Sequence, residues 1–491
     1  MKRLRSAANI LAVAAFFFGA ILWVAYVWVT NRFETATLET IVLYLSLPLT
    51  GVDMRFIYSL SAQVACVVLA TVAFALLLRR SSGGAKLFGL PAKYFGPLFL
   101  LVSAGLLCSS LYVIEERYQV REFLFPDGGM YTFFEENLEH VTAEDVSFPD
   151  RKNNVVLVIL ESVENTMLDP AVFNPVLMPK VRELATENTA FTGQRQCVGS
   201  EYSIASFQSL MLAVPFLTGV AERAARVIDG DLDSIFTKVK ERDFTNTSLL
   251  GMFEKHGYKI KMFRCADARF TAYNDFMEMA TSACEVYDFV YYRDRGDVSG
   301  PQNYWGLNDS FIYERAKEHM RSVYQDGPFF LFIQTVGTHA PGLYEPGMLR
   351  AYGDYRDSYV QADMLVDGFV RWIREQEFGP DTTIVLVGDH LNGFREIGPV
   401  SLPKPADRGI LSVFINSLAE GGNVNRRRPF ATWDLPPTII EAAGGVVPDG
   451  KMGFGVSLYS KEKNLLEKYG FSHVNSMLKK RSKLYVDEFL W

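Results

Sequence analysis

The sequence predicts an α/β protein with transmembrane helices at its N-terminus. A domain with a mostly parallel sheet, covered by helices on both faces, is expected to follow them. Three observations support this prediction. The first ~115 of 491 residues hold three long apolar runs. Strand-like and helix-like segments alternate in the remainder. Two of the strand-like runs end directly in side chains that bind metals.

The apolar runs predict a transmembrane domain over residues 1–115. Each run is long enough to span a bilayer, and they lie at about 10–29, 57–78 and 94–114. A signal peptide is the alternative for the first run, but this run is long, rich in aromatic residues and without a small-x-small cleavage site. The segment 38–52 is too short to span and contains Pro48 and Gly51, so we expect an interfacial segment there.

Basic residues predict the orientation of these spans. They cluster at the N-terminus (Lys2, Arg3 and Arg5) and in the loop 79–86 after the second span. Cytoplasmic loops are enriched in Lys and Arg, so both regions are expected in the cytoplasm. An odd number of spans then places the rest of the chain outside it. We expect a multi-pass protein of the inner (cytoplasmic) membrane, with its soluble domain on the periplasmic side.

Charge and cysteine content limit the possible partners. The net charge of −7 does not favour nucleic acid, which is bound by basic surfaces. Outside the cytoplasm, Cys265 and Cys284 could form a disulfide, which would leave Cys197 free.

The soluble part is predicted to consist of a connecting arm (116–152), an α/β domain (153–460) and a C-terminal tail (461–491). For the tail, a helix packed on the domain is favoured over one resting on anionic lipid. Apolar runs and helical periodicity predict strands at 155–160, 190–192, 259–263, 329–334, 384–387 and 411–415, and helices at 178–188, 310–324 and 359–376.

Two of these strands end in candidate metal ligands. The run 155–160 is followed by Glu161, and the run 384–387 is followed by Gly388, Asp389 and His390. Ligand sites in open α/β sheets lie at the carboxyl ends of the strands, so we expect these side chains to meet. Carboxylate and imidazole ligands together suit zinc or manganese better than calcium. The alternative is an ordinary Asp-His pair in a loop.

A candidate nucleophile precedes a helical pattern. Gly199 and Ser200 stand just before the apolar positions that begin at Ile204, which makes Ser200 a candidate N-cap. The same geometry would place a serine hydroxyl at a helix N-terminus, where anions bind and a metal can activate the hydroxyl. Ser203, in the first turn, is the rival nucleophile, and Ser200 is favoured over it.

Four motifs occur together in one order along the chain. They are Glu161-Ser162 after a strand, Gly199-Ser200 before a helix, Thr338-His339-Ala340-Pro341, and Gly388-Asp389-His390 after a strand. With the N-terminal spans and the segments 47–53 and 434–440, they resemble the membrane-anchored lipoteichoic acid synthase and phosphoglycerol transferase branch of the alkaline phosphatase/sulfatase superfamily. The resemblance covers nearly the whole chain and implies a domain of that fold.

The resemblance also implies roles for individual residues. It implies one divalent metal ion, with manganese favoured over zinc or magnesium, held by Glu161, Asp389, His390 and the oxygen of Ser200. Ser200 matches the nucleophile, which is usually Thr in this family. His339 matches a substrate-binding histidine. Trp305 and Asp309, in a Trp-Gly-x-x-Asp element, match residues near the acceptor.

The function implied by the resemblance is transfer of a phosphoglycerol head group from phosphatidylglycerol to a cell-envelope glycan. Alternatives are a phosphoethanolamine transferase acting on lipopolysaccharide or glycan, a hydrolase of sulfuric esters or phosphodiesters, and an inactive sensor or scaffold. The sequence after Ser200 lacks the Pro and Arg of the sulfatase motif Cys/Ser-x-Pro-x-Arg, which disfavours sulfuric ester hydrolysis.

Overall fold

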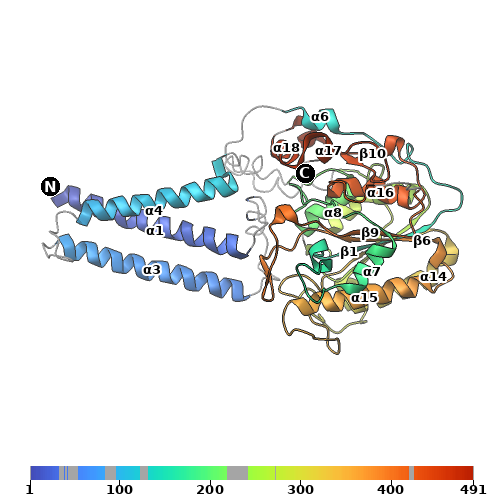
Figure 1. Cartoon of the computed structure of the whole chain (residues 1–491), viewed down its shortest axis with the longest axis horizontal. Coiled ribbons are helices and arrows are strands. Elements are labelled where there is room, and N and C mark those ends of the chain that lie inside the picture. The colour runs from blue at the N-terminus through green and yellow to red at the C-terminus, as the bar shows by residue number, and fades with distance from the viewer. Residues whose placement is uncertain are drawn as a thin grey trace. The chain divides into compact units, whose positions relative to one another are not determined.

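The structure is a computed structural model. It describes residues 2–32, 38, 41, 54–82, 95–121, 131–217, 242–270, 273–419, 425–480 and 482–489. The chain divides into two units, residues 1–126 and 127–491, and Figure 1 shows the elements of both.

The described residues of the first unit form the helices α1 (Lys2–Arg32), α3 (Met54–Ser82) and α4 (Phe95–Tyr118). By length and composition all three can cross a membrane, as predicted. The helices α1 and α4 approach closely: the hydroxyl of Ser110 donates to the carbonyl of Gly19 at 2.8 Å. Small residues allow such an approach between apolar helices. The predicted interfacial segment 38–52 lies outside the described residues, apart from two isolated positions.

The second unit is built on a seven-stranded sheet in the order β2-β9-β6-β1-β5-β3-β4. The strands are β1 (Asn154–Leu160), β2 (Thr189–Ala190), β3 (Lys259–Arg264), β4 (Glu285–Tyr287), β5 (Phe329–Gln334), β6 (Thr382–Gly388) and β9 (Ser412–Ile415). Strand β1 lies between β5 and β6 and is parallel to both. Strand β9 is antiparallel to its two neighbours. The predicted, mostly parallel sheet is therefore confirmed, with β4 as an additional short strand.

Helices cover both faces of the sheet (Figure 1). On one face, Phe329, Leu331 and Ile333 of β5 share a buried core with α7 (Pro179–Glu187), α14 (Asp309–Val323) and α15 (Arg356–Arg374). The alternate residues of β5 point the other way, as strand geometry requires. The ring of Phe332 packs against Phe207 of α8 (Ser203–Leu212), and that of Phe330 packs against Phe253 of α11 (Leu249–Lys255). The prediction of helices on both faces is confirmed.

The register aligns the ends of the two central strands. Leu160 of β1 pairs with Gly388 of β6, so the next residue on each strand, Glu161 and Asp389, leaves the sheet at the same edge. No side chain would fit at position 388, because a Cβ on Gly388 would collide with the carbonyl of Val163. The loop after β1 can therefore pass close to the end of β6.

The predicted connecting arm belongs in part to the second unit. Its helix α6 (Phe133–Asn137) contributes Phe133 and Phe134 to a second buried cluster, which also contains Trp433, Phe454 and Tyr485. The predicted tail forms the helices α17 (Leu465–Tyr469), α18 (Phe471–Leu478) and α19 (Lys483–Glu488), which pack into the same cluster. A helix packed on the domain was the favoured prediction for this tail.

This second cluster contacts the segment that leads into and out of α8. The side-chain oxygen of Asn475 on α18 accepts the backbone N–H of Val198 at 2.7 Å. The hydroxyl of Tyr485 on α19 accepts the N–H of Leu217 at 2.7 Å and donates to the carbonyl of Pro215 at 3.0 Å. The segments on both sides of α8, which begins at Ser203, are thus held by the C-terminal helices.

Candidate active site

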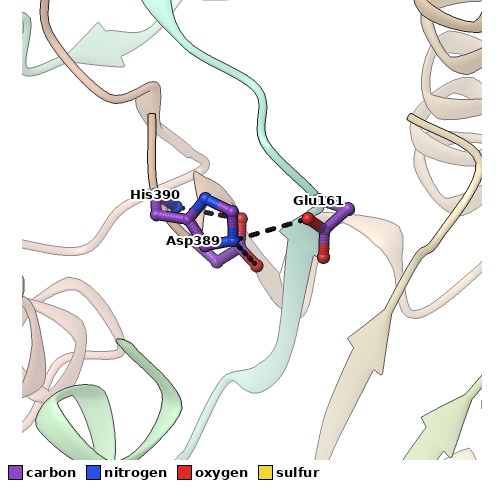
Figure 2. Close-up of side chains that lie close together, drawn as sticks. All are labelled: Glu161, Asp389 and His390. Atoms are coloured by element: carbon purple, nitrogen blue, oxygen red, sulfur yellow. Dashed lines mark hydrogen bonds and ion pairs between the residues drawn. The ribbon is translucent and has the colours of Figure 1, made fainter. Parts of the chain in front are cut away.

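Glu161, Asp389 and His390 come together at the carboxyl edge of the sheet, as predicted from the strand ends. One potential ligand atom from each lies within 4.8 Å of the others. The Nε2 atom of His390 is 3.4 Å from a carboxylate oxygen of Glu161 and 3.4 Å from one of Asp389, as Figure 2 shows. Both carboxylates are buried, with exposed fractions of 4% and 2%.

The donors present fit a divalent transition metal. One oxygen of Asp389 accepts the backbone N–H groups of Ser162 and His390, at 2.8 and 2.9 Å. The other oxygen is buried and has no hydrogen-bond partner within the described parts of the chain. The Nδ1 atom of His390 lies 3.0 Å from the carbonyl of Leu391. A carbonyl can only accept, so Nδ1 carries a proton, and Nε2 faces the carboxylates, where a bound metal would take its lone pair.

The electrostatics of the site also suit a cation. Burial, together with the charge of Glu161, raises the pKa of Asp389 to about 7. Burial would also raise the pKa of Glu161, but the neighbouring His390 and His339 hold it below its usual value. Two buried carboxylates at this distance repel each other. A divalent ion between them would remove the repulsion and keep both ionised.

The serine beside these residues is Ser203, the first residue of α8. Its hydroxyl donates to Glu161 at 3.1 Å and lies 3.3 Å from Nε2 of His390. The backbone before it is extended at Tyr202, and no side chain caps the helix. The free N–H groups of the first turn and the helix dipole therefore favour an anion beside Ser203.

The predicted position of Ser200 at the metal site needs correction. Ser200 is fully buried, and its hydroxyl donates to the carbonyl of Cys197 at 2.9 Å. Gly199 adopts a φ of +85°, so the two residues form a turn that precedes the helix instead of capping it. The helix begins two residues later than a cap at Ser200 would place it, and this shift brings Ser203 to the carboxylates.

His339 and Trp305 lie together near the cluster. Their ring centroids are 4.6 Å apart, and His339 is close enough for its charge to lower the pKa of Glu161, against the effect of burial. The loop of His339 is tied to the end of β1, because the hydroxyl of Thr338 donates to the carbonyl of Glu161. These two residues are therefore placed where a bound substrate could reach them.

Asp309, predicted to bind substrate, has a different environment. Its buried carboxylate accepts the N–H groups of Val336 at 2.8 Å and Gly337 at 3.0 Å. The thiol of Cys265 donates to it at 3.2 Å, and burial raises its pKa to about 6. The carboxylate thus positions the loop before His339 and is not available to substrate. Cys265 and Cys284 are both free thiols, so the suggested disulfide is absent.

We expect Asp309→Asn to lower turnover by misplacing His339. An amide in place of the carboxylate would direct its own N–H group toward one of the two backbone N–H groups that now donate to Asp309. A buried group left without a hydrogen bond in this way lowers the stability of the fold by about 1–3 kcal/mol. Asp357→Asn is a matched control, since Asp357 is also buried and accepts two backbone N–H groups, those of Tyr352 and Gly353. Both variants should melt at a lower temperature, and only Asp309→Asn should also lose activity. Equal rates in the two variants would contradict this role.

Other residues around the site had no signal in the sequence. The side-chain amide of Asn392 donates to the hydroxyls of Tyr355 and Tyr359, at 2.8 and 2.6 Å. The buried guanidinium of Arg408 donates to the carbonyl of Asn392 and to the carboxylate of Glu164, each at 3.2 Å. This buried network fixes the chain just after His390. Its members are distant in sequence, so only the fold reveals it.

Comparisons with known proteins identify the family of this chain. Residues 153–445 match the Sulfatase family. Phosphoglycerol transferase I of Xanthomonas campestris pv. campestris is 25% identical over 336 residues, which cover 64% of this chain and 43% of the relative. This chain therefore spans less than half the length of that relative.

Two solved structures are also similar. The lipoteichoic acid synthase LtaP from Listeria monocytogenes matches at 19% identity and a TM-score of 0.46, over 65% of this chain and 81% of that one. The lipooligosaccharide phosphoethanolamine transferase A of Neisseria meningitidis matches at 14% identity and a TM-score of 0.46, over 89% and 84%. Since the family match covers more than half of the sequence, this chain belongs to the sulfatase family.

Proposed function

We propose that this protein is a membrane-bound, metal-dependent transferase. It moves a phosphoglycerol head group from phosphatidylglycerol to a cell-envelope glycan. The observation that carries the proposal is the contact of the Ser203 hydroxyl with Glu161 and His390 at the start of α8. The name of the Xanthomonas relative supports the choice of head group. In this proposal Ser203 replaces Ser200 as nucleophile and as the metal-bound oxygen.

The reaction has two steps. In the first, the oxygen of Ser203 bonds to the phosphorus of the donor, and the bond from phosphorus to the diacylglycerol oxygen breaks. The proton that Ser203 loses is balanced by the proton that the diacylglycerol oxygen takes up, and His339 is the group that can donate to that oxygen. In the second step the acceptor hydroxyl loses its proton and bonds to phosphorus, His339 is the group that can accept this proton, and the Ser203 oxygen leaves and is protonated again.

The other groups of the site position the substrate and stabilise charge on it. A divalent metal held by Glu161, Asp389 and His390, manganese by preference over zinc, would acidify the serine hydroxyl and stabilise charge on the phosphoryl oxygens. The N–H groups at the start of α8 can donate to the same oxygens. Trp305, beside His339, offers an aromatic face for the substrate.

The proposal is tested by mass spectrometry of the metal-loaded full chain after exposure to vesicles. With phosphatidylglycerol and no acceptor, we expect the mass of a phosphoglycerol group on the peptide that contains Ser203. The mass of a phosphoethanolamine group on the same peptide, formed only with phosphatidylethanolamine as donor, would identify a phosphoethanolamine transferase instead. Release of free glycerol phosphate at the rate of diacylglycerol release would indicate a hydrolase, and no reaction with any donor would favour a sensor or scaffold.

We also propose that the second unit lies on the periplasmic side of the inner membrane. Three helices can cross the membrane, and α3 ends in Arg79 and Arg80, which favour the cytoplasm. A reporter enzyme that is active only outside the cytoplasm, fused after Trp491, is expected to be active. Activity of a cytoplasmic reporter at the same position, with a silent periplasmic one, would reverse the proposed topology.

A further inference from the structure

Arg264, the last residue of β3, is a buried cation. Its side chain is only 6% exposed. Its Nε and Nη1 atoms are buried and have no hydrogen-bond partner among the residues that the structure describes. Asp267, three residues on, is bound by Arg269 instead, with 2.6 Å between nitrogen and oxygen. Burial of a charge without an acceptor is costly, so this arrangement calls for an anion.

An aromatic ring holds the guanidinium in place. Its central carbon lies 3.5 Å from the ring centroid of Tyr273, which is a cation–π contact. The hydroxyl of Tyr273 accepts a hydrogen bond from the side-chain amide of Gln334 at 3.1 Å. The contact with the ring face orients the planar guanidinium but uses none of its N–H groups. The guanidinium is therefore fixed in direction, while its Nε and Nη1 donors keep no hydrogen-bond partner among the described residues.

The guanidinium lies at the same edge of the sheet as the active site. Arg264 pairs with Gln334 of β5, and Gln334 pairs with Ile159 of β1, two residues before Glu161. The ring of Tyr273 packs on Phe207 of α8, with 4.7 Å between centroids. Phe207 is one helical turn after Ser203, so both lie on the same face of α8. Arg264 and Tyr273 thus lie beside the helix turn that presents Ser203.

We propose that Arg264 binds the anionic phosphodiester of the lipid donor and makes the site select a donor whose head group carries no positive charge. This inference rests on the proposed transferase function. A guanidinium can bind two phosphoryl oxygens at once. The same fixed, buried charge repels the ammonium of a zwitterionic head group, and such repulsion is an effective source of specificity. Phosphatidylglycerol is then favoured over phosphatidylethanolamine.

The first test separates a ligand-binding role from a structural one. In the metal-loaded full chain without substrate, we expect Arg264→Met to melt at an equal or higher temperature than the parent, because it removes a buried charge whose Nε and Nη1 atoms have no hydrogen-bond partner among the described residues. Arg428→Met is the matched control: Arg428 is 5% exposed but donates to the carbonyls of Ser460 and Glu462 and to the carboxylate of Glu467. The control should melt at a lower temperature. An equal loss in both variants would show that Arg264 is structural and overturn the inference.

The second test measures selectivity without turnover. Isothermal titration calorimetry of the metal-loaded Ser203→Ala chain compares glycerophosphoglycerol with glycerophosphoethanolamine, the deacylated forms of the two candidate donors. We expect at least about tenfold tighter binding of glycerophosphoglycerol. Adding Arg264→Met should remove most of this preference, and adding Arg428→Met should preserve it. A preference that survives in Arg264→Met, or that is absent in the parent, would overturn the inference.

Diacylglycerol release from phosphatidylglycerol vesicles by the wild-type chain distinguishes this inference from the proposed function. If the wild-type chain releases none but the Arg264-dependent preference is present, the transferase function fails and Arg264 remains an anion-binding residue. If the wild-type chain releases diacylglycerol and Arg264→Met does so at the same rate from both lipids, the function stands and the role of Arg264 is refuted.

Discussion

Replacement of Ser203 by Ala is expected to abolish both the release of diacylglycerol and the transfer to acceptor. Removal of a nucleophile that acts with its neighbours as a unit costs several orders of magnitude in rate, and we expect a loss of at least ~10³-fold. The fold should survive, because the hydroxyl of Ser203 makes its contacts with side chains of the candidate metal site, among them Glu161 and His390. Diacylglycerol release from phosphatidylglycerol vesicles measures the effect, and thermal unfolding checks the fold.

Ser200→Ala is the matched control for this experiment. The substitution removes one buried hydrogen bond, to the carbonyl of Cys197, and should cost roughly 1 kcal/mol of stability. Because this hydroxyl is turned away from the metal ligands, most of the rate should remain. An inactive Ser200→Ala chain together with an active Ser203→Ala chain would return the nucleophile to Ser200. Near-normal turnover of both variants would rule out a covalent serine intermediate.

Replacement of His390 by Ala is expected to remove the metal and the activity together. The imidazole is one of three side chains that surround the candidate metal position, and Asp389 and Glu161 would be left to repel each other without it. We expect metal affinity to fall by at least ~100-fold, since loss of outer partners alone costs 10–100-fold. Elemental analysis of the purified chain measures metal content, and diacylglycerol release measures turnover.

His256→Ala provides the control for His390. Both ring nitrogens of His256 lie near backbone carbonyls, those of Met252 and Val146 at 2.8 and 2.9 Å. His256 precedes the start of β3 and is not at the carboxyl end of a strand. This variant should keep its metal and its rate. A chelator should reproduce the effect of His390→Ala in the wild-type chain, and added Mn²⁺ should reverse it. Full metal content in purified His390→Ala would remove this residue from the ligand set.

The sheet could be predicted because its central strands are apolar on both faces. Strands β1, β5 and β6 are buried at every position, so each appears in the sequence as an uninterrupted apolar run. Strand β4 has only three residues, Glu285–Tyr287, and a partly exposed pattern. Its short length gives no such signal, and its pairing with β3 is set by the tertiary fold.

The site residues that directly follow a strand could be predicted from the sequence. Those at the start of a helix were harder to predict. Glu161 and Asp389 follow strands of known direction, so their meeting could be expected. Ser200 and Ser203 are three residues apart in one turn, and both suit the start of a helix by composition. Only the extended backbone at Tyr202 decides between them. Asp309 was predicted to bind substrate because the sequence does not show that two backbone N–H groups already donate hydrogen bonds to its carboxylate.

The second buried cluster has a consequence for how the catalytic region can be isolated. The family match begins at residue 153 and ends at 445, but Phe133 and Phe134 lie before it and Val474 and Tyr485 lie after it. A fragment cut at the family boundaries would lose both halves of this cluster and the anchors of Val198 and Leu217. The unit that folds is thus larger than the unit shared by the family. A soluble enzyme fragment should begin before Tyr131 and retain α19, because the turn that carries Ser203 depends on both extensions.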